Sequence, residues 1–293
     1  MSDLIGVLNI DKPKGLTSHD VVARVRKIAG LRRVGHAGTL DPLARGVLVV
    51  CLGKATRLIE YLMDTHKSYV ATVEFGTVTD TWDAEGEVIE RQEIEDLSLA
   101  RIEEALERFR GRIEQVPPMY SAVKHKGEPL YRLARKGIEV EREARSVEIH
   151  HLEVREWNPP DLLIEVECSK GTYIRSLAYD LGRSVGSGAY LADLTRMAVG
   201  PFCLERAVPL CQLTEKRWRD HLLPVYKAFK HVPGVIVDQE TQEHIGYGQA
   251  VTLPSAPEEE IVFAYDDERR IVAVLRSDAD DPLWRPRKVL RTN

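Results

Sequence analysis

Cysteine is scarce in this sequence, and its four cysteines are widely spaced. Cys51, Cys168, Cys203 and Cys211 form no CxxC pair, so neither a disulfide framework nor a zinc site built from cysteine pairs is expected. Cys51 and Cys168 lie in apolar, strand-like runs, which favours buried and reduced thiols. We therefore expect a cytoplasmic protein.

Long apolar runs are also missing. No stretch approaches the roughly 20 apolar residues of a membrane-spanning helix, and the first residues do not resemble a signal peptide. The sequence contains no P-loop, no GxGxxG and no cluster of metal ligands. His150 and His151 are adjacent on an expected strand and would point to opposite faces. We predict no membrane association and no metal site at this histidine pair.

Charge is abundant but unevenly distributed along the 293 residues, although the net charge is only −5. Residues 1–60 carry ten Lys/Arg against five Asp/Glu, whereas residues 79–107 carry eleven Asp/Glu against two Arg. A local basic face can bind a polyanion whatever the total charge. The acidic segment is typical of a solvated helix and loop.

Residues 34–46 (VGHAGTLDPLARG) form a polar, glycine-rich loop that contains His36 and Asp41. The apolar run of residues 47–52 follows directly and predicts a buried strand. The loop could present Asp41 as a catalytic carboxylate on a rigid element. Equally, Asp41 could cap a short helical turn beginning at Pro42. The loop alone leaves both interpretations open.

Hydrophobic periodicity and turn residues predict alternating strands and helices over the first 200 residues or so. We expect strands at residues 4–10, 67–76, 146–157 and 162–168, helices at residues 17–30, 55–64 and 97–109, and a further helix that runs through Leu177, Ala178 and Leu181. Residues 77–86 are expected to form turns. From about residue 234, short β runs at 235–237, 245–251, 261–265, 271–275 and 288–290 are typical of a small barrel. We place a domain boundary there, giving domains 1–233 and 234–293.

A basic segment at residues 124–145 carries seven Lys/Arg, Lys124 and Arg132 among them, against four Asp/Glu. It could be a solvated helix and loop. It could also be an arm that contacts phosphates, since lysine and arginine supply sequence-independent affinity for nucleic acid.

Six motifs together resemble the bacterial tRNA pseudouridine-55 synthases, the TruB family. In chain order they are KPKGLTS (12–18), GHAGTLDPLA (35–44), KSY (67–69), PPMYSAVK (117–124), GTYIRSL (171–177) and LADLTR (191–196). The ordered set is far more specific than any one motif. The C-terminal segment, closing with RPRKVL (285–290), resembles the small RNA-binding PUA barrel.

The resemblance implies an α+β fold, with a mixed, largely antiparallel sheet, flanking helices and a C-terminal PUA-like β-barrel. Residues 124–145 would be an insertion that contacts RNA. The implied activity is isomerisation of uridine 55 in the T-loop of tRNA to pseudouridine, with no cofactor. The T-arm of tRNA is the implied partner. We expect no obligate protein partner, and a monomer.

The resemblance also assigns roles to residues. Asp41 would be the catalytic aspartate, acting by covalent addition or by assisting loss of the base. Arg175 would pair with Asp41 and keep it ionised. Tyr69 would lie against the target base, and we favour stacking over proton transfer because a phenol has a pKa of about 10.

Other positions implied by the resemblance concern the RNA. Leu194 would form the apolar wall opposite Tyr69, and His36 would stabilise the RNA loop after the target base has flipped out. Lys12 would support the site. The remaining RNA-binding positions are Tyr173, Lys124 and Arg132.

Three alternatives stay open. The chain could be a non-catalytic RNA-binding protein or RNA chaperone, although a pure binder has no need for Asp41 facing a polyanion. It could take its targets from a guide RNA, as archaeal and eukaryotic relatives do, although a compact chain without long Lys-rich tails favours the stand-alone type. It could also modify another uridine.

Overall fold

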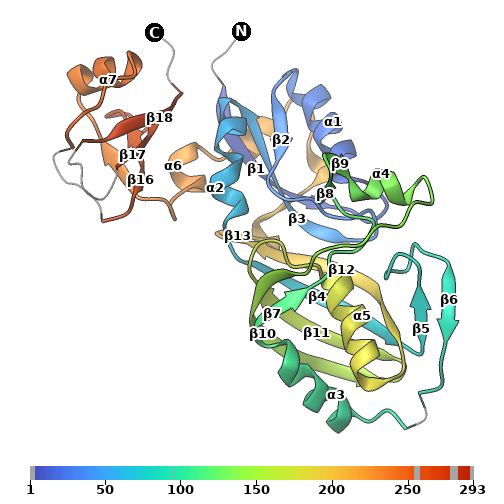
Figure 1. The fold of residues 1–293 in the computed structure, drawn as a ribbon. Helices are drawn as coiled ribbons and strands as arrows, with labels where there is room; N and C mark the ends of the chain where they lie inside the picture. The colour runs from blue at the N-terminus through green and yellow to red at the C-terminus, as the bar shows by residue number, and fades with distance from the viewer. Residues whose placement is uncertain (1–3, 95, 254–257, 278–282, 291–293) are drawn as a thin grey trace.

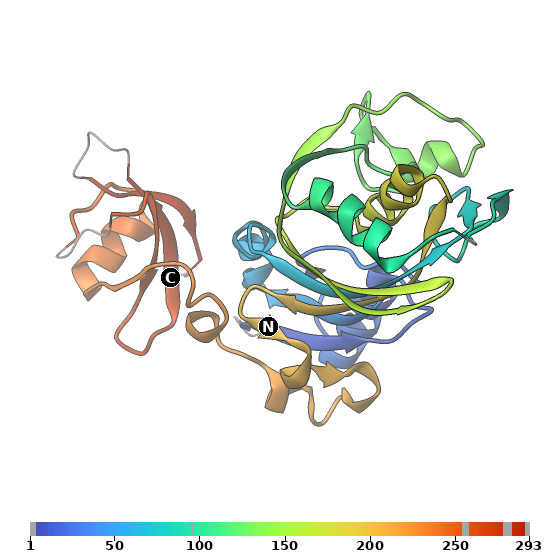
Figure 2. The ribbon, with the colours of Figure 1, turned by 90° about the horizontal axis from the view of Figure 1, so that it is seen from below.

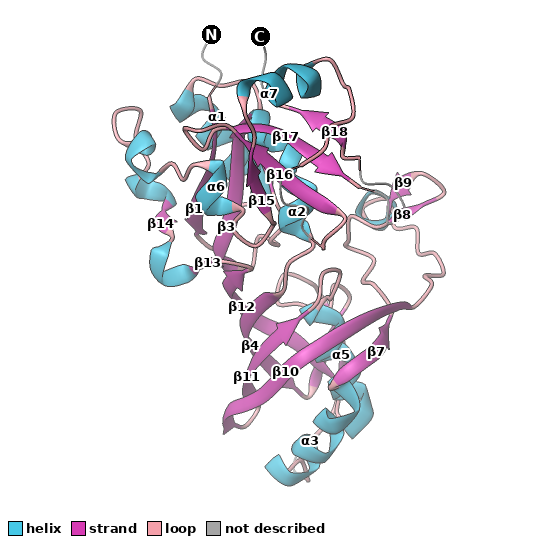
Figure 3. Cartoon of the chain, turned by 90° about the vertical axis from the view of Figure 1, so that its left-hand side faces the viewer, coloured by secondary structure: helices cyan, strands magenta, loops and turns pink. Residues whose placement is uncertain are grey.

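A large sheet organises the first two thirds of the chain in the computed structural model, which describes residues 4–94, 96–253, 258–277 and 283–290. Its strands are β1 (Ile5–Lys12), β2 (Val34–His36), β3 (Arg45–Gly53), β4 (Lys67–Phe75), β7 (Gly111–Gln115), β10 (Arg145–Asn158), β11 (Asp161–Cys168), β12 (Ala189–Val199), β13 (Phe202–Cys203) and β14 (Val208–Pro209). The main path runs β14-β1-β3-β12-β4-β11-β10-β7, with β2 beside β3 and β13 beside β12. Figure 3 shows β12, β4, β11 and β10 side by side.

The sheet is mixed and largely antiparallel. Only two neighbouring pairs run parallel, β12 with β3 and β1 with β14, among the strands of the described residues. The predicted α+β fold is confirmed. The parallel pairing of β12 with β3 matters most, because it brings residues around Thr195 beside Arg45.

The helices lie against the large sheet, in its loops, or in the C-terminal part of the chain (Figure 1). They are α1 (Ser18–Ala29), α2 (Ile59–Met63), α3 (Leu99–Leu106), α4 (Leu130–Ala134), α5 (Ile174–Val185), α6 (Val225–Ala228) and α7 (Gln239–Gly246). Short 3-10 turns are η1 (Lys54–Leu58), η2 (Glu107–Phe109), η3 (Leu204–Arg206), η4 (Leu210–Gln212) and η5 (Trp218–His221). Two small hairpins pair β5 (Thr77–Thr79) with β6 (Val88–Arg91) and β8 (Lys124–His125) with β9 (Glu128–Pro129).

Helix α1 follows directly from its sequence. Thr17 accepts the backbone N–H of Asp20, and the Asp20 carboxylate accepts from the Thr17 backbone in return, which is a capping box. Gly30 ends the helix at a φ of 63°, a left-handed conformation that glycine adopts without steric cost. The predicted helix is therefore confirmed at both ends.

Strand β3 is buried on both faces, as its continuous apolar run predicts. Val47, Val49 and Cys51 pack into one hydrophobic cluster, whereas Leu48 and Val50 pack into another beneath α1. A third cluster joins α3 and α5 to the face made by β4, β10, β11 and β12. The sheet thus has a rigid centre, and the loop before β3 projects from it.

The C-terminal residues form a second sheet, which Figure 2 shows to one side of the first. Its strands are β15 (Gly234–Ile236), β16 (Ile261–Tyr265), β17 (Ile271–Arg276) and β18 (Arg285–Val289), in that order across the sheet. Phe263 and Tyr265 share a cluster with Val7 and Val47 of the large sheet. Lys288 forms an ion pair with Glu60 of α2. The proposed domain includes residues 254–257, 278–282 and 291–293, which lie outside the described residues.

Three local predictions are wrong. Residues 245–251 do not form a β run, because Asp238 caps α7 by accepting from the Thr241 N–H, and this helix buries Ile245. Residues 55–64 do not form one helix but a 3-10 turn followed by α2. Residues 77–79 form a strand rather than a turn. No helix within the described ranges is long and apolar enough to cross a membrane.

Candidate active site

The backbone of the loop that carries Asp41 is held by Arg196 of β12, a fully buried arginine. Its Nε donates to the carbonyl of Val47 at 2.7 Å, and its two terminal nitrogens donate to the carbonyls of Thr39 and Gly38, each at 3.1 Å. A buried charge is tolerated when its donors are satisfied in this way. Arg196 therefore fixes the loop just before Asp41.

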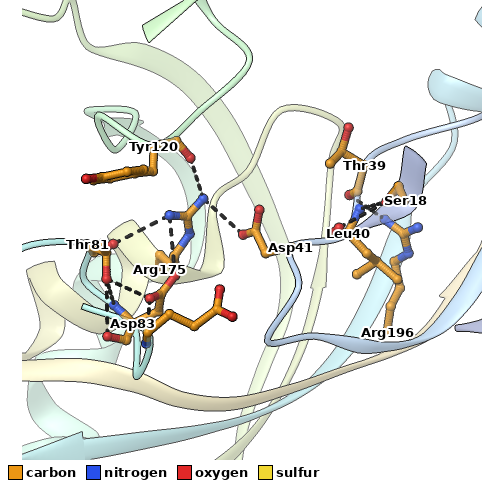
Figure 4. A network of polar contacts seen from close by, with 10 residues as sticks. Ser18, Thr39, Leu40, Asp41, Thr81, Asp83, Tyr120, Arg175 and Arg196 are labelled. Atoms are coloured by element: carbon orange, nitrogen blue, oxygen red, sulfur yellow. Dashed lines mark hydrogen bonds and ion pairs between the residues drawn. The ribbon is translucent and has the colours of Figure 1, made fainter. Parts of the chain in front are cut away.

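A second anchor comes from α1. The Ser18 hydroxyl accepts the Leu40 N–H at 2.8 Å and donates to the Leu40 carbonyl at 2.9 Å (Figure 4). At the other end of the loop, Gly46 has a φ of 103°, and a Cβ there would lie 2.3 Å from the Arg196 carbonyl oxygen. Only glycine allows β3 and β12 to approach so closely at this point.

Asp41, in this loop, forms an ion pair with Arg175. Nη2 of Arg175, on the first turn of α5, lies 2.9 Å from Oδ2 of Asp41, and Nη1 lies 3.4 Å from Oδ2 of Asp83 (Figure 4). Nη2 also donates to the Tyr120 carbonyl at 2.7 Å. The side chains of Arg175 and Asp83 are 5% and 4% exposed, whereas that of Asp41 is 35% exposed. Asp41 is therefore the open member of the group.

Asp41 does not cap a helix. Residues 41–44 form a bend in which the Ala44 N–H donates to the Asp41 carbonyl at 3.1 Å, and no helix begins there in the described chain. The interpretation of Asp41 as a helix cap is therefore wrong. Its carboxylate faces Arg175 instead.

The charges around Asp41 act in opposite directions on its pKa. Burial raises the pKa of Asp41 above its ordinary value, the Arg175 guanidinium lowers it, and the Asp83 carboxylate raises it again. Arg175 is thus the main group that favours the ionised form. A nearby cation opposes the effects of burial and of Asp83, both of which favour the protonated carboxyl group.

Tyr69 and Leu194 lie in one apolar cluster with Leu40 and Leu43, at the side of the Asp41 loop. They are 7% and 6% exposed and come from neighbouring strands, β4 and β12. Burial raises the pKa of Tyr69. A phenol with a raised pKa is an even weaker base at neutral pH, which is consistent with a stacking role.

His36 and Lys12 lie beside the same loop but differ in what they offer. Burial lowers the pKa of His36 to about 4, so this ring is neutral at pH 7, and it meets His19 edge-on with ring centroids 5.5 Å apart. Lys12 is fully buried, and its Nζ donates to the carbonyls of Pro13 and Leu16 at 3.0 and 2.6 Å. The Lys12 ammonium group thus holds the turn after β1, and its role at the site stays a prediction.

Three other residues expected to bind RNA lie at the start of α5 and in the basic segment, residues 124–145. The Tyr173 backbone exchanges two hydrogen bonds with the Gln115 side chain, at 2.7 and 2.9 Å, and this fixes the start of α5. Lys124 and Arg132 are exposed on β8 and α4. They belong to the basic segment and form no ion pair with Asp41, Arg175 or Asp83 in the described part of the chain.

Sequence reasoning missed Asp83, Arg196 and Ser18. Arg196 and Ser18 lie at the ends of motifs that were singled out, so their positions carried a signal. Asp83 lies in a polar segment that was expected to form only turns, and nothing in its local pattern predicts a contact with α5. Within the described ranges no group of three or more His, Cys, Asp or Glu could hold a metal ion; the expectation of a cofactor-free reaction stays a prediction.

Comparison with known proteins decides the family. A family model described as "TruB family pseudouridylate synthase (N terminal domain)" matches residues 26–174. A protein of Dehalococcoides mccartyi named tRNA pseudouridine synthase B is 46% identical over 288 residues, covering 97% of this chain and 96% of its own. This chain belongs to the TruB family of pseudouridylate synthases. A Yersinia pestis member of the same name is 40% identical and covers 98% of this chain and 93% of its own.

Solved structures agree with this TruB assignment. A chain in the crystal structure of a Cbf5-Nop10-Gar1 complex superposes with a TM-score of 0.75 at 30% identity, covering 98% of this chain and 85% of its own. An H/ACA RNP bound to a substrate RNA containing 2′-deoxyuridine gives a TM-score of 0.72 at 27% identity, with coverages of 98% and 85%. The predicted family is confirmed, and with it an isomerase of the pseudouridine synthase class.

Proposed function

We propose that this enzyme isomerises uridine 55 in the T-loop of tRNA, in the cytoplasm, with Asp41 as its catalytic carboxylate. Relatives named tRNA pseudouridine synthase B, 40–46% identical over nearly the whole chain, support tRNA as the substrate. The single observation that carries the role of Asp41 is its ion pair with Arg175. A buried guanidinium holds one side of the carboxylate, while the other side stays open to a ligand.

The reaction needs a carboxylate rather than an oxidant or an activated cofactor. The N1–C1′ bond of the uridine breaks, the uracil turns, and a C5–C1′ bond forms; C5 loses a proton and N1 gains one, so no atom is gained or lost. An ionised Asp41 would stabilise positive charge developing at C1′, or form a transient bond there. Arg175 would keep Asp41 charged and aimed at the sugar.

The flipped base would lie between Tyr69 and Leu194. Removing a uridine from a folded loop costs stacking free energy of a few kcal/mol, which an aromatic surface on the enzyme partly restores. The neutral His36 ring would fill the space that the flipped base leaves in the RNA loop. A neutral imidazole suits this role because it can stack without a charge to desolvate.

The tRNA arm would be bound by two parts of the chain outside the site, of which residues 124–145 are basic. Residues 124–145 expose Lys124 and Arg132, and side chains of this type supply most of the affinity for phosphates. Residues 234–293, with their separate four-stranded sheet, would form a PUA-like RNA-binding domain. Bacterial relatives match this chain at higher identity than the chains of the RNA–protein assemblies do, which supports a stand-alone monomer.

The experiment that tests this proposal is pseudouridine mapping on T-arm RNA treated with wild type and with Asp41→Asn. We expect pseudouridine at position 55 from the wild type and none from the variant, while tRNA binding stays within about threefold because the substitution is isosteric. Asp161→Asn, exposed at the start of β11, is the matched control and should be fully active. Full activity of Asp41→Asn would contradict the catalytic role, and an inactive wild type would favour an RNA chaperone.

A further inference from the structure

Trp82 occupies a turn between two residues that contact Arg175. Its neighbour Thr81 accepts from Arg175 Nη1 through its carbonyl at 3.5 Å, and its other neighbour Asp83 forms the 3.4 Å ion pair with the same nitrogen. We infer that Trp82 is a positioning residue that connects the basic insertion, residues 124–145, to the Asp41–Arg175 pair. This inference rests on the RNA-binding role proposed for the insertion.

The backbone at Trp82 is strained. Its φ is 63°, a left-handed conformation that bulky residues rarely adopt. The turn is held in this state by the Trp82 N–H, which donates to Thr79 at 3.2 Å, and by the Trp82 carbonyl, which accepts from Leu191 at 3.0 Å. Such strain persists only where surrounding contacts enforce it. In this conformation the indole contacts Tyr179 and Arg142.

The first neighbour is Tyr179 of α5. The two rings stack with centroids 4.2 Å apart and an angle of 13° between their planes. Tyr179 lies one helical turn after Arg175, so it shares a face of α5 with that residue. The Trp82 ring therefore joins the turn that carries Asp83 to the helix that carries Arg175.

The second neighbour is Arg142, near the end of the insertion. Its guanidinium carbon lies 5.4 Å from the centroid of the Trp82 indole, within the range of a cation–π contact. Nη1 of Arg142 donates to the Pro117 carbonyl at 3.2 Å, and its Nε is buried with no hydrogen-bond partner in the described part of the chain. The Arg142 side chain is only 15% exposed. It therefore faces the protein and not the RNA.

Both ends of the insertion thus reach the same arginine. The segment entering it contacts Arg175 directly through the Tyr120 carbonyl at 2.7 Å. The segment leaving it contacts Arg175 indirectly, through Arg142 and then Trp82. RNA seated on the exposed lysines and arginines between these ends would hold both contacts in place, and Arg175 would then present Asp41 to the base in one orientation.

The inference predicts an effect on the chemical step rather than on binding. In single-turnover assays with saturating T-arm RNA, Trp82→Ala should lower the rate constant about tenfold or more, because a misplaced catalytic pair is costly. The Kd for RNA should stay within about threefold. Trp82→Phe, which keeps an aromatic ring, should recover most of the rate. Tyr226→Ala, which removes the ring beneath Arg269 at 5.6 Å, is the matched control and should leave the rate unchanged.

If Trp82→Ala does not fold, Arg142→Gln tests the same connection by removing the guanidinium that contacts the Trp82 ring. We expect Arg142→Gln to slow the chemical step as well, and the double variant Trp82→Leu/Arg142→Gln, whose leucine fills space without a ring, to lose less than the sum of the single losses in free energy. Trypsin should cleave residues 124–145 faster in Arg142→Gln than in wild type, a readout that needs no activity. Additive losses, unchanged cleavage or an unaffected single-turnover rate would overturn the inference. A wild type that makes no pseudouridine would instead overturn the proposed function.

Discussion

Nη2 of Arg175 lies 2.9 Å from Oδ2 of Asp41, and the arginine is almost fully buried while the aspartate is open on one side. The same guanidinium also contacts Asp83, which is buried. One cation therefore serves two carboxylates, of which only Asp41 can meet a ligand. This sharing determines how the site should respond to substitution and to pH.

Substituting Arg175 should damage both activity and stability. Arg175→Gln would leave Asp83 buried without its cation, at a cost of about 3–5 kcal/mol in the free energy of unfolding. The single-turnover rate should fall by about 100-fold or more, because Asp41 loses its charge partner and its orientation. Arg175→Lys should remain impaired, since an ammonium group cannot bridge both carboxylates.

Thermal unfolding and single-turnover assays measure these two effects separately. Arg183→Gln, on the exposed side of the same helix and 3.7 Å from Glu90, is the control and should behave like wild type. An Arg175→Gln variant with normal activity would refute the pairing as a catalytic requirement.

The pH–rate profile should reflect the raised pKa of Asp41. If the carboxylate is the active form, the rate increases as the pH rises through this pKa. Burial and Asp83 raise the pKa, so the increase should lie above the value of about 3.9 for an ordinary aspartate. Asp83→Asn removes the neighbouring negative charge and should move the increase to lower pH. The rate constant for pseudouridine formation on enzyme-bound RNA, measured as a function of pH, checks this. A shift of the increase to higher pH in Asp83→Asn would contradict it.

Gly46→Ala should destabilise the protein strongly. The new Cβ would lie 2.3 Å from the Arg196 carbonyl oxygen, in a residue with a φ of 103°. Overpacking and backbone strain together should lower the free energy of unfolding by roughly 2–5 kcal/mol. Gly111→Ala is the control, because Gly111 also has a positive φ, of 75°, but a Cβ there meets nothing within 4 Å. Comparable melting temperatures for the two variants would show that close approach to β12 is not what requires Gly46.

Arg132→Ala and Lys124→Ala should weaken tRNA binding in a salt-dependent manner. Each lost phosphate contact should reduce the slope of log K against log salt concentration by about 0.7–0.9. Arg155→Ala is the control, since this exposed arginine of β10 is paired with Glu165 at 2.9 Å. Filter binding at several salt concentrations gives the slopes. Unchanged slopes for both variants would argue that residues 124–145 do not contact the RNA backbone.

Local patterns predicted most of the elements because their causes lie within a few residues. The capping box of Thr17 and Asp20 and the left-handed Gly30 fix the ends of α1 without help from the rest of the fold. The same local logic failed at residues 239–246, where the Asp238 cap and a buried Ile245 outweigh the apparent β run.

The sequence by itself determined the buried strand β3 and the helix α1, because periodicity is a property of the chain. The order of its motifs determined the family and the expectation that Asp41 pairs with Arg175. Only the tertiary structure decided which groups surround this pair. Arg196 reaches the Asp41 loop because β12 lies parallel to β3. Asp83 and Trp82 reach α5 from a turn that is held against β12 at Leu191. Contacts of that kind join residues far apart in the chain, and no local pattern encodes them.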